Sequence, residues 1–148
     1  MCHTDMTSRT GMVILANGGV IATNSSKQKF VTKSSTEAEL VSLCDAGSMA
    51  LYLRQFLELQ GMKVPPIVLY QDNKSVMELL SANHHGVRGS KHIQVRYFFV
   101  RQHMTTGELI VQWIPTAQMF ADIMTKPLIG QLFRNIRDGI MVFWECSM

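Results

Sequence analysis

The sequence predicts one α/β domain built on a mixed sheet, with a hairpin first and crossover helices after it. A turn-forming Asn17-Gly18 pair separates two short strand-like segments near the start of the chain. Helical patterns then alternate with apolar runs of strand length. The chain has 148 residues, of which 47% are hydrophobic and 17% charged, so residues 1–148 are expected to form a single domain.

The first half of the chain predicts two strands, a long helix and a further strand. Strands are expected over residues 10–16 and 20–24, followed by a polar turn over 25–28 and an extended piece over 29–32. A long helix is expected to begin near Ser34, because Ser34 with Glu37 and Thr36 with Glu39 form two overlapping capping boxes. Gly61 is expected to end this helix. Residues 67–70 form an apolar run that is typical of a strand buried on both faces.

The second half predicts four further helices and one strand. A short helix over 75–82 is expected after a turn at 72–75, and residues 83–89 have the composition of a loop. A third helix, capped by Ser90, covers 91 to about 104, and Gly107 ends it before a strand over 108–113. Pro115 opens a helix through about residue 125, and residues 127–139 form a last amphipathic helix.

Composition and charge exclude some classes of protein. No apolar run approaches the roughly 18–20 residues of a membrane span, and the first residues carry no secretory signal. The three cysteines are odd in number and lack metal-type spacing, which suits a reducing, intracellular compartment. The net charge of +3 alone does not indicate a nucleic-acid partner.

Three acidic residues fall on three different predicted elements. Glu39 lies in the first turns of the long helix, Asp72 follows the apolar strand, and Asp122 lies in a later helix. Carboxylates that converge at one sheet edge are ligands that Mg²⁺ prefers. Each acid also has a structural explanation, as a helix N-terminal charge, an Asx turn or a solvated helix residue, and Glu37 competes with Glu39. Spacing alone leaves these alternatives open.

Four motifs stand in order along the chain: Ser34-Ser35-Thr36-Glu37-Ala38-Glu39; Tyr70-Gln71-Asp72-Asn73-Lys74-Ser75; Lys91-His92-Ile93 with Arg96-Tyr97-Phe98; and Pro115-Thr116 followed by Ala121-Asp122-Ile123-Met124-Thr125-Lys126-Pro127-Leu128. They resemble the SSTEAE, DNxS, KHI…RYHF and PT…ADxxTKPL motifs of ribonuclease H domains in copia-type retrotransposon Pol polyproteins. The resemblance covers about residues 8–138 and leaves 139–148 as a tail.

This resemblance implies a ribonuclease-H-like fold that hydrolyses the RNA strand of RNA–DNA hybrids by two-metal catalysis. It implies Glu39, rather than Glu37, together with Asp72 and Asp122 as catalytic metal ligands. Two Mg²⁺ or Mn²⁺ ions are then expected in a complete site. The implied partners are the hybrid and the reverse transcriptase and integrase parts of the same polyprotein, with no membrane. The implied location is a cytoplasmic virus-like particle or the nucleus.

One departure from the family pattern concerns its first catalytic aspartate, which lies on a strand ahead of the segment matching residues 7–11. Asp5 is the acid available upstream, and it falls in a polar link rather than on a strand. The expectation is therefore an N-terminally truncated copy without the first strand, with an exposed sheet edge and little or no cleavage. The alternative function is a catalytically inactive remnant that binds nucleic acid or has a structural role.

Basic residues cluster at the start of the predicted third helix. The residues proposed to contact phosphates are Arg88, Lys91, His92 and Arg96, with Arg101 and His103 further along. The alternative is a solvated helix face. The histidines at 84, 85 and 92 have no cysteine partner at zinc-site spacing, so zinc is not predicted.

Overall fold

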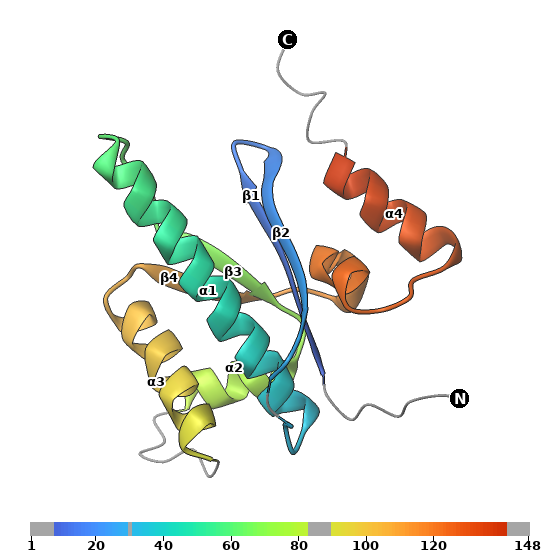
Figure 1. The fold of residues 1–148 in the computed structure, drawn as a ribbon, viewed down its shortest axis with the longest axis horizontal. Coiled ribbons are helices and arrows are strands. Elements are labelled where there is room, and N and C mark those ends of the chain that lie inside the picture. Colours follow the sequence, from blue (N-terminus) through green and yellow to red (C-terminus); the bar gives the residue numbers. More distant parts are fainter. Residues whose placement is uncertain (1–7, 30, 83–89, 142–148) are drawn as a thin grey trace.

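The computed structural model describes residues 8–29, 31–82 and 90–141, and these form a mixed α/β structure (Figure 1). In chain order the elements are β1 (Arg9–Ala16), β2 (Gly19–Lys27), α1 (Ser35–Leu59), β3 (Ile67–Gln71), α2 (Lys74–Ser81), α3 (Lys91–Thr105), β4 (Leu109–Trp113), the 3₁₀ turns η1 (Thr116–Gln118) and η2 (Phe120–Met124), and α4 (Gly130–Met141).

The strands form two separate two-stranded sheets among the described residues, and not the single mixed sheet that the sequence predicts. β1 and β2 are antiparallel, and their turn has Asn17 at φ 50° and Gly18 at φ 77°, the two positive values that a type I′ turn requires. β3 and β4 are parallel and are connected through α2 and α3. No described strand lies between β1 and β3, so the two sheets are not joined by hydrogen bonds into one.

Helix α1 packs on both sheets and holds them in one structure (Figure 1). Its start is fixed by Ser34, whose hydroxyl oxygen accepts a hydrogen bond from Glu37 N at 3.2 Å. The Glu37 carboxylate accepts from Lys33 N at 2.8 Å, so the Ser34–Glu37 pair forms the cap and Glu39 is left for another role. Gly61, at φ 83°, follows the helix end as predicted.

The core lies between α1, α2, α3 and the β3–β4 sheet. Its most buried side chains are Leu40, Val76, Leu80, Val100 and Leu109. Gly47 lets α1 approach the sheet closely, because a Cβ there would lie 3.3 Å from Leu69 Cδ1 and 3.4 Å from Leu109 Cδ1. The prediction that β3 is buried on both faces was wrong: Val68 and Tyr70, on the face away from α1, are 37% and 51% exposed.

Several predicted boundaries differ from the structure. Residues 25–27 continue β2 rather than forming a turn, and the described residues of 29–32 are not a strand. The helix expected over 115–125 consists of the two 3₁₀ turns η1 and η2. The last helix begins later, at Gly130 (φ 67°), and it packs through Gly139 against the Phe120 ring. Ile136 is buried, whereas Leu132 and Phe133 of the predicted apolar face are exposed.

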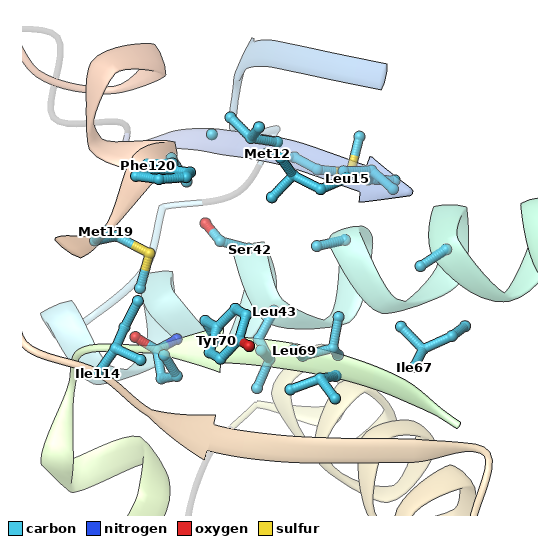
Figure 2. A pocket seen from close by; sticks show the side chains of 18 of the residues that line it. Met12, Leu15, Ser42, Leu43, Ile67, Leu69, Tyr70, Ile114, Met119 and Phe120 are labelled. Atoms are coloured by element: carbon cyan, nitrogen blue, oxygen red, sulfur yellow. The ribbon is translucent and has the colours of Figure 1, made fainter. Parts of the chain in front are cut away.

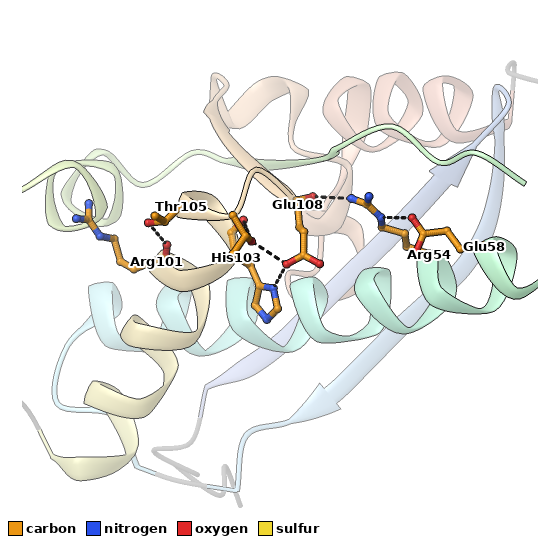
Figure 3. Close-up of polar contacts among 7 residues, drawn as sticks. Arg54, Glu58, Arg101, His103, Thr105 and Glu108 are labelled. Carbon is orange, nitrogen blue, oxygen red and sulfur yellow. Dashed lines mark hydrogen bonds and ion pairs between the residues drawn. The ribbon is translucent and has the colours of Figure 1, made fainter.

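A polar network connects α1 to the end of α3 and the start of β4 (Figure 3). Arg54 donates to Glu58 Oε1 at 2.8 Å and to the Glu108 carbonyl at 3.4 Å. His103 Nδ1 lies 2.6 Å from Glu108 Oε2, which also accepts from Thr106 Oγ1 at 2.8 Å. These hydrogen bonds lower the pKa of Glu108. Over the same described ranges, no helix has the length and apolar character to cross a membrane.

Candidate functional site

Glu39 lies one turn into α1, on a half-buried side chain that lines the space between the two sheets. Burial raises the pKa of its carboxyl, and the negative charges of Asp72 and Asp122 raise it further. The charge of Lys126 and a hydrogen bond with Gln71 act in the opposite direction. Glu39 therefore lies within electrostatic reach of both other predicted acids.

Asp72 is positioned by the turn that joins β3 to α2. The side-chain oxygen of Gln71, a buried residue, accepts hydrogen bonds from Asp72 N at 2.9 Å and Asn73 N at 3.0 Å. Asn73 caps α2 by accepting from Ser75 N at 2.9 Å. Trp113 Nε1 donates to the Asp72 carbonyl at 3.0 Å, so the end of β4 supports the same turn.

Asp122 lies in η2 and is 8% exposed. Lys126 Nζ donates to both of its carboxylate oxygens, each at 2.9 Å. Although burial alone would lower the pKa of Lys126, the hydrogen bond to Asp122 and the charges of Asp122, Asp72 and Glu39 raise it. Lys126 is therefore the cation that the three carboxylates share in this structure.

Glu39 of α1, Asp72 of the turn after β3 and Asp122 of η2 all line the space between the sheets, and Glu39 feels the charge of the other two. Their carboxylate oxygens are the kind of ligand that a hard divalent cation prefers. In spacing they do not close a site: within residues 8–29, 31–82 and 90–141, no three Asp, Glu, His or Cys side chains are grouped closely enough to hold a metal ion. Lys126 also occupies both carboxylate oxygens of Asp122, which a metal ion would need as ligands.

Gln71 and Gln28 are two buried amides near this site that sequence reasoning missed. Gln71 links the Asp72 turn to Glu39. The Gln28 amide nitrogen donates to the Ala38 carbonyl at 3.0 Å and to Thr10 Oγ1 at 3.2 Å, which fixes the hairpin beside the first turns of α1. Gln71 stands inside the Tyr70–Ser75 motif, the one signal that could have indicated it.

The predicted basic residues differ in exposure and in their contacts. Lys91 and His92, at the start of α3, are exposed. Arg96 is half-buried, donates to the His92 carbonyl at 3.2 Å, and lies near Asp45 of α1, whose pKa its charge lowers against the larger effect of burial. His103 contacts Glu108. Arg88, and the histidines at 84 and 85, lie outside the described residues.

Comparison with known proteins gives three informative relatives. The chain is 34% identical over 119 residues to a retrovirus-related Pol polyprotein from transposon TNT 1-94 of Nicotiana tabacum, covering 80% of this chain and 9% of the relative. It is 34% identical over 139 residues to the Pol polyprotein from transposon RE1 of Arabidopsis thaliana, covering 93% and 9%. A Ty1-NL2 Gag-Pol polyprotein of Saccharomyces cerevisiae is 27% identical over 129 residues, covering 86% and 7%.

No family model and no solved structure matches the chain. The chain spans less than a tenth of the length of each of these three relatives, so the activities of the whole polyproteins do not transfer to it directly. Most of its length is covered by each match. The homologues of this chain are therefore retrotransposon Pol polyproteins from plants and yeast.

Proposed function

We propose that the chain is a ribonuclease-H-like domain of a Pol polyprotein, which in its complete form hydrolyses the RNA strand of RNA–DNA hybrids. The observation that carries the proposal is that Glu39, Asp72 and Asp122, the acids of three separate motifs, line one groove, and that Glu39 lies within electrostatic reach of the other two. Reverse transcriptase and integrase parts of a polyprotein are the proposed neighbours, in an intracellular setting.

Two of the chain's own residues would prepare this site. Gln71 accepts hydrogen bonds from two backbone N–H groups of the Asp72 turn, so the backbone that carries this carboxylate is held before substrate arrives. The pKa of Glu39 is raised above its ordinary value of 4.5, so this carboxyl ionises, and can act as a metal ligand, only at a higher pH than an ordinary glutamate. A bound divalent cation would supply the activation of water for attack on the phosphodiester.

Lys126 favours a second candidate function, a non-catalytic domain that binds nucleic acid. Its ammonium group already neutralises Asp122 at 2.9 Å from both oxygens, and the described acids do not form a closed group of three. In this alternative, Lys91 and His92 on α3 contact phosphates and no strand is cut.

The two functions are separated by incubating the purified protein with a labelled RNA–DNA hybrid and Mg²⁺ or Mn²⁺. If the domain is an enzyme, we expect RNA fragments to form, and Glu39→Gln or Asp72→Asn should abolish their formation. Glu37→Gln is the matched control, because it makes the same change two residues away in the helix cap. Hybrid binding that weakens with salt, without fragments, would support the non-catalytic domain instead.

A further inference from the structure

A stripe of large apolar side chains runs along the exposed side of α1, in its C-terminal half. Its members are Met49, Tyr52, Phe56 and Leu59, which are 41%, 67%, 53% and 80% exposed. Their spacing of three, four and three residues keeps them in one row, on the side of the helix away from Gly47, which faces the β3–β4 sheet. Packing within the described core therefore does not account for these four side chains.

This α1 stripe is separate from the groove between the two sheets. Figure 2 shows that groove, which Ser42 and Leu43 of α1 line together with Leu69 of β3. None of the four stripe residues lines it. In Figure 1 the C-terminal end of α1 extends beyond α3, the helix that packs against it. The stripe is therefore open to a partner that approaches α1 from outside.

The spacing and charge of the stripe favour another helix as its partner. A row of large apolar residues at alternating intervals of three and four is the pattern that packs against a second helix. Between Asp45 and Lys63 the charged residues are Arg54 and Glu58, which pair with each other at 2.8 Å. Arg54 also donates to the Glu108 carbonyl, so this pair lies on the side of α1 that faces β4. The stripe itself is thus an uncharged surface, with one acid before it and one base after it.

The stripe is complementary to a second copy of itself when the two helices run antiparallel. If the two copies of α1 cross at position 54, Tyr52 of one lies opposite Phe56 of the other, because both are two residues from that position. Met49 and Leu59, each five residues from it, lie opposite each other in the same way. Aromatic rings then meet aromatic rings at the centre, and aliphatic side chains meet on either side.

Charge at the two ends of the stripe favours the same direction. Asp45 and Lys63 are both exposed, and they lie nine residues before and nine residues after position 54. The antiparallel pair brings Asp45 of each copy close to Lys63 of the other, whereas a parallel pair would bring like charges together. Arg96 of α3 also acts on Asp45 within each copy, so a second cation adds to an environment that is already favourable to this carboxylate.

We propose that two copies of this chain associate through their α1 helices, packed antiparallel along the α1 stripe. Each helix is already formed and held by its own core, so the association does not have to nucleate helix. A contact in which both copies use the same surface closes on itself and yields a dimer rather than a filament. The inference does not depend on catalysis or on nucleic-acid binding.

Sedimentation equilibrium of the purified chain tests the association, at concentrations from roughly 1 µM to roughly 1 mM, which cover weak dimers. We expect a monomer–dimer equilibrium. Phe56→Glu places a carboxylate opposite Tyr52 of the second copy and is expected to weaken the dimer about 30-fold or more, as for a central aromatic residue of an interface. Phe98→Glu is the matched control, because it makes the same change at a ring of α3 that is 54% exposed, and it should leave the dimer unchanged. A wild-type chain that stays monomeric throughout, or two variants that behave alike, would overturn the proposal.

Charge reversal tests the antiparallel direction. Lys63→Asp is expected to weaken the dimer several-fold at low salt, because it places two carboxylates together at each end, and added salt should reduce the difference. Lys29→Asp makes the same change in net charge at an exposed position away from α1 and should have no such effect. Adding Asp45→Lys to Lys63→Asp restores opposite charges and is expected to recover the dimer. Equal weakening by Lys29→Asp, or no recovery in the double variant, would contradict antiparallel packing.

Discussion

The packing of η2 against β1 predicts that Gly11→Ala destabilises the protein. A Cβ at Gly11 would lie 2.4 Å from Thr125 Cγ2, 2.8 Å from the Ala121 carbonyl oxygen and 3.1 Å from Met124 Cβ. Two of these atoms belong to or adjoin the backbone and cannot rotate away, so η2 must move with Asp122. Overpacking of this kind costs about 1–3 kcal/mol, whereas the smaller loss of backbone entropy on folding with alanine returns about 0.5–1 kcal/mol.

The expected net loss is about 1–2 kcal/mol, which lowers Tm by about 3–6 °C for a chain of this size. The assay is thermal unfolding followed by circular dichroism. Gly19→Ala in the same hairpin is the control, since its Cβ would meet nothing nearer than the Ala16 carbonyl oxygen at 3.9 Å. Adding Thr125→Ser to Gly11→Ala removes the closest clash and should recover part of the loss. If Gly11→Ala melts with the wild type and Gly19→Ala, η2 does not pack on β1 as described.

Three further predictions concern charge. Lys126→Met leaves the buried Asp122 carboxylate unpaired and should cost about 1–3 kcal/mol in urea unfolding. Millimolar Mg²⁺ should restore part of that lost stability. The control is Lys74→Met, which removes an ammonium group that lies over the Trp113 ring, and Mg²⁺ should not restore stability there. Equal recovery in both variants would contradict the prediction. Burial raises the pKa of Glu39, so its ionised form penalises folding at neutral pH, and the penalty disappears below its ordinary value of 4.5. Glu39→Gln should therefore raise Tm at neutral pH, with the gain vanishing below pH 4.5, and a pH-independent gain would refute this. Lys91→Ala should weaken hybrid binding and reduce its salt slope by about one, measured by fluorescence anisotropy, whereas a change at Lys63 should not.

Local features of the fold could be predicted from the sequence because nearby residues determine them. The Asn17-Gly18 turn and the Ser34 cap depend on side chains within three positions. The 3₁₀ turns at 116–124 could not be distinguished from an α-helix, because the same apolar spacing fits both in so short a segment. The split of the sheet was also missed, because strand pairing depends on contacts between residues far apart in sequence.

The acids of the candidate site could be named from motifs, but their electrostatic partners could not. Glu39, Asp72 and Asp122 stand in motifs with a family resemblance, whereas the ion pair between Asp122 and Lys126, four residues later, depends on the backbone path just after η2. Gln71 was passed over because a polar residue at a strand end has many structural roles. Its function as a brace for the Asp72 turn is visible only when its oxygen is seen between two backbone N–H groups.

The contact at Gly47 determines how α1 is placed between the β1–β2 hairpin and the β3–β4 sheet. It lies eight residues after Glu39, about 12 Å along the helix, and fixes α1 to Leu69 and Leu109 with no room for a methyl group to spare. Because the described sheets share no strand, a tilt of α1 about this contact moves the hairpin and η2, with Asp122, relative to Asp72 at the end of β3. A substitution at Gly47, Leu69 or Leu109 is therefore expected to change the spacing of the carboxylates without touching any of them.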